Sequence, residues 1–374
     1  MQTYIVVGAG ILGASTAYQL AKEGAKVTIV DRKDEGQATD AAAGIVCPWL
    51  SQRRNKTWYR LASGGARYYP QLIKELEADG ETSTGYKRVG AISLHTEERK
   101  LEKMIERALK RREDAPEIGE ITRLSSLETK RMFPPLSDEY RAVHVSGAAR
   151  VNGRALRNAL IRAAKKYGAS FVEAEAQLIS EGKRVTGVQA NEQVYTADTV
   201  IVTAGVWAKH LLQPLDIHFK VTAQKAQIAH LELLDKDTNS WPVVIPPTNH
   251  YLLTFDEGRV VAGATHEDNK GFDTRVTAGG MQEIFTKALT IAPGLENATI
   301  LESRVGFRPF TPGFLPVFGV CPYYEGLLLA NGLGASGLTS GPYLGAELAK
   351  LALGKPTELD PSDYDISEAV EKMT

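Results

Sequence analysis

The sequence predicts an α/β fold in which a strand–helix–strand unit opens the chain. Three observations support this prediction. Residues 4–31 contain an apolar strand, a glycine-rich turn, a helix and a second strand. Transitions from an apolar strand to glycine recur at residues 199–205 and 326–339. Between these two segments, short stretches at 217–233, 243–246, 250–255 and 259–264 alternate with Pro and Gly, which is typical of an antiparallel sheet.

The first unit is sharply delimited. Residues 4–7 are predicted to be a buried strand, residues 14–23 a helix and residues 26–30 a second strand. The turn is Gly8-Ala9-Gly10-Ile11-Leu12-Gly13, and Asp31 follows the second strand. A Gly-x-Gly-x-x-Gly sequence is a weak signal alone, but here strand, helix, second strand and acid all accompany it. The segment is therefore identified as a Rossmann-like dinucleotide-binding unit.

Each part of this unit has a physical role in holding a dinucleotide. Gly8 permits the tight turn, Gly10 lets a pyrophosphate approach the backbone, and Gly13 lets helix and strand pack closely. The helix N-terminus offers free N–H groups to the phosphates. Asp31 can accept hydrogen bonds from both ribose hydroxyls of an adenosine. Arg32 could pair with a 2′-phosphate, but the adjacent carboxylate would repel one, which argues against NADP.

The continuation of the chain favours FAD over NAD. An NAD dehydrogenase usually adds further βα units, whereas residues 36–45 here are a run of small residues that lets backbone lie against a flat group. A surface loop is the alternative, but the apolar Ile45 and Val46 favour burial. Further elements are expected as helices at 97–112, 153–168 and 279–292, strands at 169–173 and 199–202, and a hairpin at 185–195.

A glycine-rich turn also opens the predicted C-terminal helix. Residues 326–330 form an apolar strand, residues 331–339 are rich in glycine, and residues 340–353 have helical periodicity. This arrangement directs a second helix N-terminus toward an electron-rich group.

Composition excludes several classes of function. The chain has 374 residues, with 44 Lys and Arg against 45 Asp and Glu, so its formal net charge is −1. This balance argues against nucleic-acid binding by bulk electrostatics and against a polybasic membrane anchor. With 34 Gly and 17 Pro, the chain is not a coiled coil or a collagen-like fibre. Its length corresponds to about two or three domains.

The cysteines and the N-terminus bear on location. Cys47 and Cys321 are too few for a disulfide framework or a zinc quartet, so a reduced, cytoplasmic setting and no metal are expected. The chain opens directly into a strand, which predicts no secretory signal. Charged residues interrupt each apolar stretch, which predicts no membrane span. Whether the chain forms a homo-oligomer is left open.

Taken together, the motifs resemble those of the D-amino-acid oxidase superfamily of FAD enzymes, nearest the glycine oxidase and sarcosine oxidase branch. The resemblance extends over roughly residues 3–355 and rests on five segments: 8–13, 36–45, Thr203-Ala204-Gly205-Val206-Trp207, Arg308-Pro309-Phe310-Thr311-Pro312 and the glycine-rich turn 332–339. It implies a discontinuous FAD-binding domain interleaved with a substrate domain on a mainly antiparallel sheet. The expected FAD-binding segments are 1–85, 144–215 and 304–365, the substrate domain takes 86–143 and 216–303, and 366–374 form a tail.

The resemblance implies noncovalent FAD, because the region before the C-terminal segment has no cysteine where sarcosine oxidases attach the flavin. Backbone N–H groups of the C-terminal turn would stabilise negative charge on the reduced flavin. The residues expected to contact FAD are Gly8, Gly10, Ile11, Leu12, Gly13, Asp31, Arg32, Thr39, Ala42, Ala43, Gly44, Ile45, Val172, Thr203, Ala204, Gly205, Trp207, Gly332, Gly334, Ala335, Ser336, Gly337, Leu338 and Thr339.

Arg308 and Tyr251 are the expected substrate-binding residues. In the family the arginine of this motif meets the substrate carboxylate, and its planar fork suits two parallel hydrogen bonds. A structural ion pair of Arg308 with Glu302 is the alternative, and for Tyr251 the alternative is a packing role. His250 and His266 are expected to be packing or surface groups. Cys47 could lie near the flavin, although a buried inert thiol is favoured.

The expected activity is oxidation of a small amino acid or secondary amine by hydride transfer from Cα to flavin N5, with oxygen as acceptor and hydrogen peroxide as product. No catalytic side chain is assigned, since a deprotonated amine needs no general base. Gly313, Ala335 and Ser336 depart from the family pattern, which leaves room for a larger or N-substituted substrate. The alternatives are a dehydrogenase with a quinone or protein acceptor, a 2-hydroxy-acid oxidoreductase, and a nonenzymatic FAD-binding protein.

Overall fold

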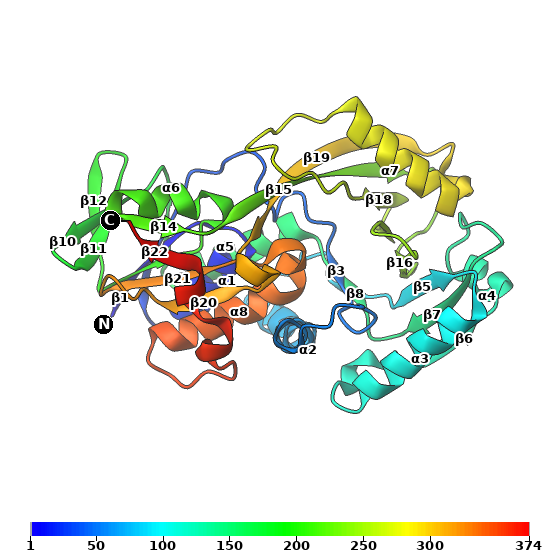
Figure 1. Cartoon of the computed structure of the whole chain (residues 1–374), viewed down its shortest axis with the longest axis horizontal. Helices are drawn as coiled ribbons and strands as arrows, with labels where there is room; N and C mark the ends of the chain where they lie inside the picture. Colours follow the sequence, from blue (N-terminus) through cyan, green and yellow to red (C-terminus); the bar gives the residue numbers. More distant parts are fainter. Residues whose placement is uncertain (1, 374) are drawn as a thin grey trace.

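The computed structural model describes residues 2–373 and contains two large sheets that lie side by side (Figure 1). The first sheet has six strands in the order β20-β21-β13-β1-β2-β9. All its neighbouring pairs are parallel except β20 with β21. Its strands are β1 (Thr3–Val7), β2 (Lys26–Asp31), β9 (Ser170–Glu173), β13 (Thr199–Val202), β20 (Val317–Val320) and β21 (Leu327–Asn331).

Apolar strands explain this sheet, because strands covered on both faces need few polar residues. One face packs against a layer of helices, in which α1 contacts both α5 and α8, and α8 also contacts α2. A second apolar cluster covers the other face. The helices of the layer are α1 (Ile11–Lys22), α2 (Lys56–Ala78), α5 (Gly153–Lys166) and α8 (Gly337–Ala352).

The second sheet has eight strands in the order β19-β15-β18-β17-β16-β5-β7-β6 and is antiparallel except for the pair β16 and β5. Helix α7 lies against β15 and β18, while α3 and α4 contact the strands at the other edge. The strands are β5 (Ala91–His95), β6 (Ile121–Leu124), β7 (Arg141–Val145), β15 (Thr222–Glu232), β16 (Val243–Ile245), β17 (Tyr251–Thr254), β18 (Arg259–Gly263) and β19 (Thr299–Phe310). The helices are α3 (Glu98–Arg112), α4 (Ser126–Met132) and α7 (Ala278–Ile291).

Smaller sheets complete the fold. They consist of β3 (Ile45–Val46), β4 (Lys87–Arg88) and β8 (Ala149–Arg150), of β10 (Gln177–Glu181), β11 (Arg184–Ala190) and β12 (Gln193–Thr196), and of β14 (Ile217–Phe219) with β22 (Val370–Lys372). The short helix α6 (Ala208–Leu212) follows β13. Among the helices of residues 2–373, none combines the length and apolar composition needed to cross a bilayer. The predicted α/β class, with a parallel and an antiparallel sheet, is confirmed.

Three element predictions were wrong in detail. Helices α1 and α8 begin at Ile11 and Gly337, three residues before the predicted starts, and residues 217–233 form two strands. The sequence analysis also gave no helix for α2, whose Gly64, Gly65 and Pro70 disfavour one. Tertiary packing overrides that preference, because a Cβ at Gly65 would lie 2.1 Å from the Thr339 carbonyl oxygen at the start of α8. The domain boundaries stay a prediction.

Candidate functional site

A cavity of about 820 Å³ lies where the carboxyl ends of β1, β2, β13 and β21 meet strands β15, β17 and β19 of the second sheet. Ligands bind at this edge of open parallel sheets. The lining comes from five stretches of chain, which are residues 7–58, 174–177, 203–214, 226–266 and 306–339, each contributing only some of its residues. The predicted convergence of the glycine-marked segments around one space is therefore present in the structure.

The glycines of the first turn divide into two kinds. At Gly8, which has φ +99°, a Cβ would lie 2.7 Å from the Thr203 carbonyl oxygen, and at Gly13 it would lie 1.9 Å from the Gly8 carbonyl oxygen. These two glycines are needed for packing. At Gly10 the nearest atom would be the Thr39 hydroxyl at an ordinary 3.5 Å, and at Gly337 no atom lies within 4 Å. Both of these line the cavity, so a Cβ there would occupy ligand space rather than protein.

Gly10 and Gly337 stand at two helix N-termini that face the same cavity. Gly10 caps α1 and Ser336 caps α8, and neither makes a side-chain cap hydrogen bond. At α1, the Ile11 N–H donates to the Thr39 hydroxyl at 3.0 Å, which fixes the small-residue loop on the helix end. Two N-termini with exposed N–H groups favour an anionic or electron-rich ligand. This arrangement fits a cofactor with a pyrophosphate and a ring that accepts charge.

Asp31 already holds the turn together. Its carboxylate accepts from the Ala9 N–H at 2.6 Å, the Lys33 N–H at 2.6 Å and the Gln37 amide at 3.0 Å. A carboxylate has about four acceptor positions, so room for a ribose hydroxyl remains. Arg32 pairs with Asp34 at 2.5 Å and Glu175 at 2.7 Å. Its guanidinium is occupied by carboxylates, and the absence of a 2′-phosphate on the ligand stays a prediction.

The run of small residues serves both the protein and the cavity. A Cβ at Gly36 would meet the Phe307 ring at 2.3 Å, and one at Gly44 would meet the Val151 carbonyl oxygen at 1.8 Å. Thus some small residues are required by packing against β19 and β8, not by a flat ligand. The cavity is instead lined by a set of alanines from the same run: Ala38, Ala41, Ala42 and Ala43.

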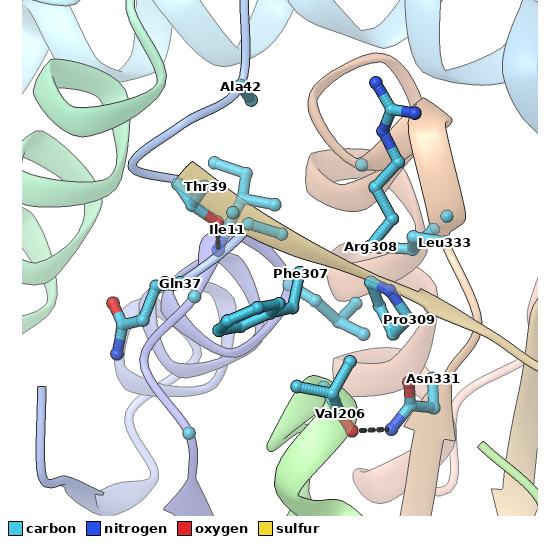
Figure 2. A pocket seen from close by; sticks show the side chains of 18 of the residues that line it. Ile11, Gln37, Thr39, Ala42, Val206, Phe307, Arg308, Pro309, Asn331 and Leu333 are labelled. Atoms are coloured by element: carbon cyan, nitrogen blue, oxygen red, sulfur yellow. Dashed lines mark hydrogen bonds between the residues drawn. The ribbon is translucent and has the colours of Figure 1, made fainter. Parts of the chain in front are cut away.

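Arg308 extends from β19 in a different direction from its neighbour Phe307 (Figure 2). Its Nη1 donates to the Gln224 amide oxygen at 3.0 Å, and within residues 2–373 no carboxylate pairs with it. Glu302 pairs with Arg304, so the alternative of an Arg308–Glu302 ion pair is wrong. Desolvation lowers the pKa of the half-buried Arg308, so its cation would be stabilised by a counter-charge. A ligand carboxylate would supply it.

Tyr251 lines the same cavity as Arg308. It pairs with Gly263 across β17 and β18, and a Cβ at Gly263 would lie 2.7 Å from its hydroxyl. Burial raises the pKa of Tyr251 to about 12, although the nearby Arg308 opposes the shift. The phenol is therefore neutral and able to donate a hydrogen bond at physiological pH. Both expected substrate-binding residues thus line one region of the cavity.

Most other predicted contact residues also line the cavity, and two do not. Gly13 is covered by the Gly8 backbone, as described. Val172 lies within β9, paired with Val30, and packs against the second apolar cluster. It does not line the cavity, because the chain enters the cavity after β9 ends, at residues 174–177. Sequence reasoning also missed many lining residues, among them Gln37, Trp58, Asn249 and His266.

The two cysteines behave differently. Cys47 lines the cavity, and burial raises the pKa of its thiol to about 12 despite the opposing Arg111. A thiol that stays protonated is a poor nucleophile, which supports the inert interpretation. Cys321 is buried in the apolar cluster behind the sheet. Noncovalent attachment of the flavin stays a prediction.

Comparison with known proteins agrees with this geometry. Residues 3–351 match the family model described as FAD dependent oxidoreductase. A curated relative, the uncharacterized oxidoreductase YurR of Bacillus subtilis (strain 168), is 66% identical over 99% of this chain and 100% of its own. The glycine oxidase of Pseudomonas putida is 27% identical over 96% and 97% of the two chains. The crystal structure of iminodiacetate oxidase from Chelativorans sp. BNC1 has a TM-score of 0.94, 46% identity and coverage of 97% and 98%.

Proposed function

The chain belongs to the family of FAD-dependent oxidoreductases, and from that premise we propose that it oxidises a small amino acid or secondary amine that carries a carboxylate. The observation that carries the proposal is Arg308, a desolvated guanidinium without a carboxylate partner within residues 2–373, in the wall of the cavity. The similarity to glycine oxidase and iminodiacetate oxidase supports an amine as the group oxidised.

The residues divide the work between binding and orientation. Arg308 donates two parallel hydrogen bonds to the substrate carboxylate, and the neutral Tyr251 hydroxyl donates a third. Together they fix the direction of the Cα–H bond, and holding a reacting bond in place is itself a large part of catalysis. When bound, FAD supplies the acceptor for the hydride that leaves Cα.

The amine proton needs no side-chain base in this scheme. The acids among the described lining residues are Asp31, Asp34 and Glu175. They lie at the ends of strands of the six-stranded sheet or just after them, whereas Arg308 lies on the eight-stranded sheet. The substrate therefore binds with its amine already neutral, and the reaction becomes faster as pH rises toward the amine pKa. Oxygen as electron acceptor, with hydrogen peroxide as product, belongs to the proposal. The alternatives are a quinone or protein acceptor, and a 2-hydroxy acid held by the same arginine.

An anaerobic screen tests the proposal. FAD-loaded protein is mixed with glycine, sarcosine, iminodiacetate, D-alanine or L-proline, and loss of the yellow absorbance is recorded. We expect at least one of these amines to bleach the flavin, while lactate and glycolate leave it oxidised. Bleaching by the hydroxy acids alone would overturn the amine assignment. Oxygen uptake with the reducing amine then separates an oxidase from a dehydrogenase.

A further inference from the structure

His266 faces the cavity because of strand alternation. After β18, residues 265–267 run beside β15, with the Lys225 N–H donating to the Glu267 carbonyl oxygen and the reverse bond also formed, each at 2.9 Å. Thr265 and Glu267 point to the face that carries Lys225 and Gln227, where the Thr265 hydroxyl and the Gln227 amide both donate to Glu267 at 2.7 Å. Successive side chains alternate between faces, so His266 points to the opposite, cavity-lining face.

Arg308 reaches the same face from the other side. It lies opposite Gln224 in the register of β15 and β19, and the next row of this face is Ala226 opposite Gly306. His266 and Arg308 are thus separated by two strand spacings and by two residues along the strands, roughly 12 Å between their backbones. The floor between them is formed by Ala226 and Gly306, which carry at most one side-chain carbon and line the cavity. A small molecule can lie on this floor with one end toward each side chain.

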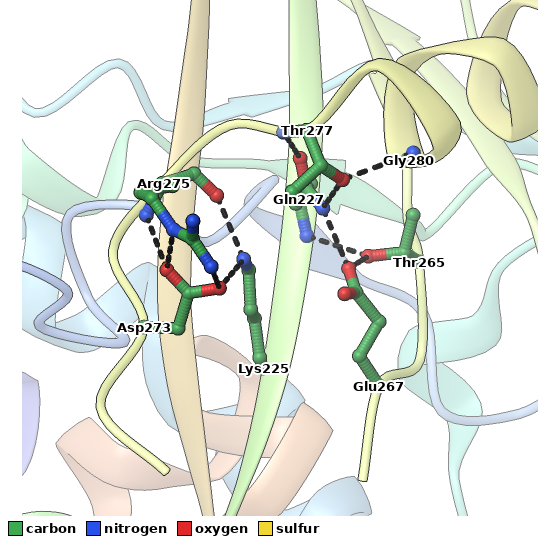
Figure 3. A network of polar contacts seen from close by, with 8 residues as sticks. All are labelled: Lys225, Gln227, Thr265, Glu267, Asp273, Arg275, Thr277 and Gly280. Carbon is green, nitrogen blue, oxygen red and sulfur yellow. Dashed lines mark hydrogen bonds and ion pairs between the residues drawn. The ribbon is translucent and has the colours of Figure 1, made fainter. Parts of the chain in front are cut away.

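A buried polar network behind the sheet fixes the segment that carries His266 (Figure 3). The fully buried Lys225 donates to the Asp273 carboxylate at 3.0 Å and to the Arg275 carbonyl oxygen at 2.7 Å. Gln227 exchanges hydrogen bonds with Thr277, donating at 3.0 Å and accepting at 2.9 Å. Because the segment is held on both sides of His266, the imidazole has a defined approach to the cavity.

The surroundings of His266 supply a partner for either protonation state. The Asn249 amide lies between two imidazoles, 3.3 Å from Nδ1 of His266 and 3.1 Å from Nδ1 of His250. In this orientation Nδ1 of His266 accepts a hydrogen bond and Nε2 carries the proton, and a hydrogen bond between the ring and the Ala264 backbone favours the charged form. A half-turn of the amide would instead offer an oxygen to a protonated His266 and a donor to His250.

We propose that His266, positioned by Asn249, binds a second acidic arm of the substrate, so that the preferred substrate class is a secondary amine with two carboxylates. This inference rests on the proposed function and names a specificity residue for it. Arg308 holds one carboxylate, the amine lies over Ala226 and Gly306, and His266 donates to the other carboxylate. A bound carboxylate favours the imidazolium, so binding of such a ligand takes up a proton.

Other charges act on the same imidazole and set the direction of its titration. Desolvation lowers the pKa of His266, and Arg308 of β19 and Lys287 of α7 lower it further, whereas Glu283 of α7 raises it. His250 stays neutral near physiological pH, since burial lowers its pKa to about 4. A dicarboxylate should therefore bind more tightly as pH falls from 8 to 6, while a monocarboxylate should not.

Two ligands without an amine test the inference in the FAD-loaded protein. Diglycolate mimics a secondary amine with two carboxylates, and methoxyacetate is its counterpart with one. Their dissociation constants are measured by perturbation of the flavin spectrum between pH 6 and 8, a readout that needs no turnover. We expect diglycolate to bind about tenfold tighter than methoxyacetate, with the difference growing at low pH.

Variants at position 266 separate a specific contact from a structural one. His266→Gln should remove the advantage of diglycolate and its pH dependence while leaving methoxyacetate binding unchanged. His266→Arg, a permanent cation, should keep the advantage and lose the pH dependence. His218→Gln on β14, away from the cavity lining, is the control and should behave like the unmodified chain.

Several outcomes would overturn the second contact. These are equal affinity for the two ligands in the unmodified chain, equal loss of both in His266→Gln, or failure of both to bind. Each of them leaves the proposed function standing if sarcosine or glycine bleaches the flavin. If no amine bleaches it, the proposed function fails whatever diglycolate does.

Discussion

At the six-stranded sheet the cavity lining includes the carboxylates Asp31, Asp34 and Glu175, whereas at the eight-stranded sheet its cation is Arg308. The acids of the first region are already bonded to backbone N–H groups and to Arg32. Within the described residues 2–373, the hydrogen-bond partner of Arg308 is the neutral Gln224. We therefore expect the first region to act as a preformed cradle that recognises the shape of its ligand, and the second region to select its ligand by charge.

The largest effect is expected where the charge is uncompensated. Arg308→Met should lower kcat/KM for the best amine substrate by about 100-fold or more, because removing one partner of a desolvated ion pair costs about 2–5 kcal/mol. Steady-state kinetics measures the loss. Arg308→Lys keeps the charge without the planar fork and should recover only part of it. The flavin content of both variants should be normal, and loss of FAD from either would contradict the division of the cavity into two regions.

A substitution in the cradle of the first region should instead weaken the binding of FAD. In Gly10→Ala the new methyl group occupies ligand space, so the dissociation constant for FAD should rise by about 10- to 100-fold, the equivalent of an overpacking cost of about 1–3 kcal/mol. Titration of the apoprotein, followed by flavin fluorescence, measures this affinity. The thermal stability of the apoprotein should change little.

Two further glycines make this comparison sharper. Gly13→Ala would force a methyl group against the Gly8 carbonyl oxygen, so it should destabilise the apoprotein itself. Gly279→Ala, in the first turn of α7 with no atom within 4 Å, is the control and should leave FAD affinity and stability unchanged or slightly improve stability. Equal FAD affinity in Gly10→Ala and Gly279→Ala would contradict the role given to Gly10.

The two regions also differ in how far the sequence predicted them. The glycine turn, Asp31 and the small-residue loop of the first cradle lie within residues 4–45, so local periodicity and the glycine spacing located them. The errors there are of register. Helix α1 begins at Ile11, so Gly13, which packs against Gly8 of the turn, already lies inside the helix. The residues that line the cavity after β9 begin two positions after Val172.

The second region depends on contacts between residues far apart in the sequence, which local spacing does not predict. Arg308 was predicted through the resemblance to a family, while its partner Gln224 lies 84 residues away. His266 was expected to be a packing or surface group, and its cavity position follows only from the pairing of residues 265–267 with β15. Alternation predicts a face only once the neighbouring strand and its register are known.

The smallest expected effect is a difference in acid stability between the two sheets. Desolvation lowers the pKa of His144, His230, His250 and His266, and all four lie in or directly beside strands of the eight-stranded sheet. For His230 and His250 the value falls to about 4. An unfolded histidine has a pKa of about 6.5, so below that pH the unfolded state binds more protons than the folded state. The free energy of unfolding therefore decreases as the pH is lowered. The loss at pH 5 should be about 1–2 kcal/mol for each of these two.

Native-state hydrogen exchange of the FAD-loaded protein at pH 7 and pH 5 measures this difference, with the two sheets of one sample as mutual controls. After correction for the intrinsic exchange rate, amides of β15 and β18 should lose protection at pH 5 while those of β1 and β13 keep theirs. His230→Gln removes a titrating group whose two ring nitrogens have no hydrogen-bond partner among residues 2–373, so it should reduce the loss in β15. Equal loss in both sheets would mean that acid acts on the molecule as one cooperative unit, and the separation of its two regions would then hold for ligand recognition but not for stability.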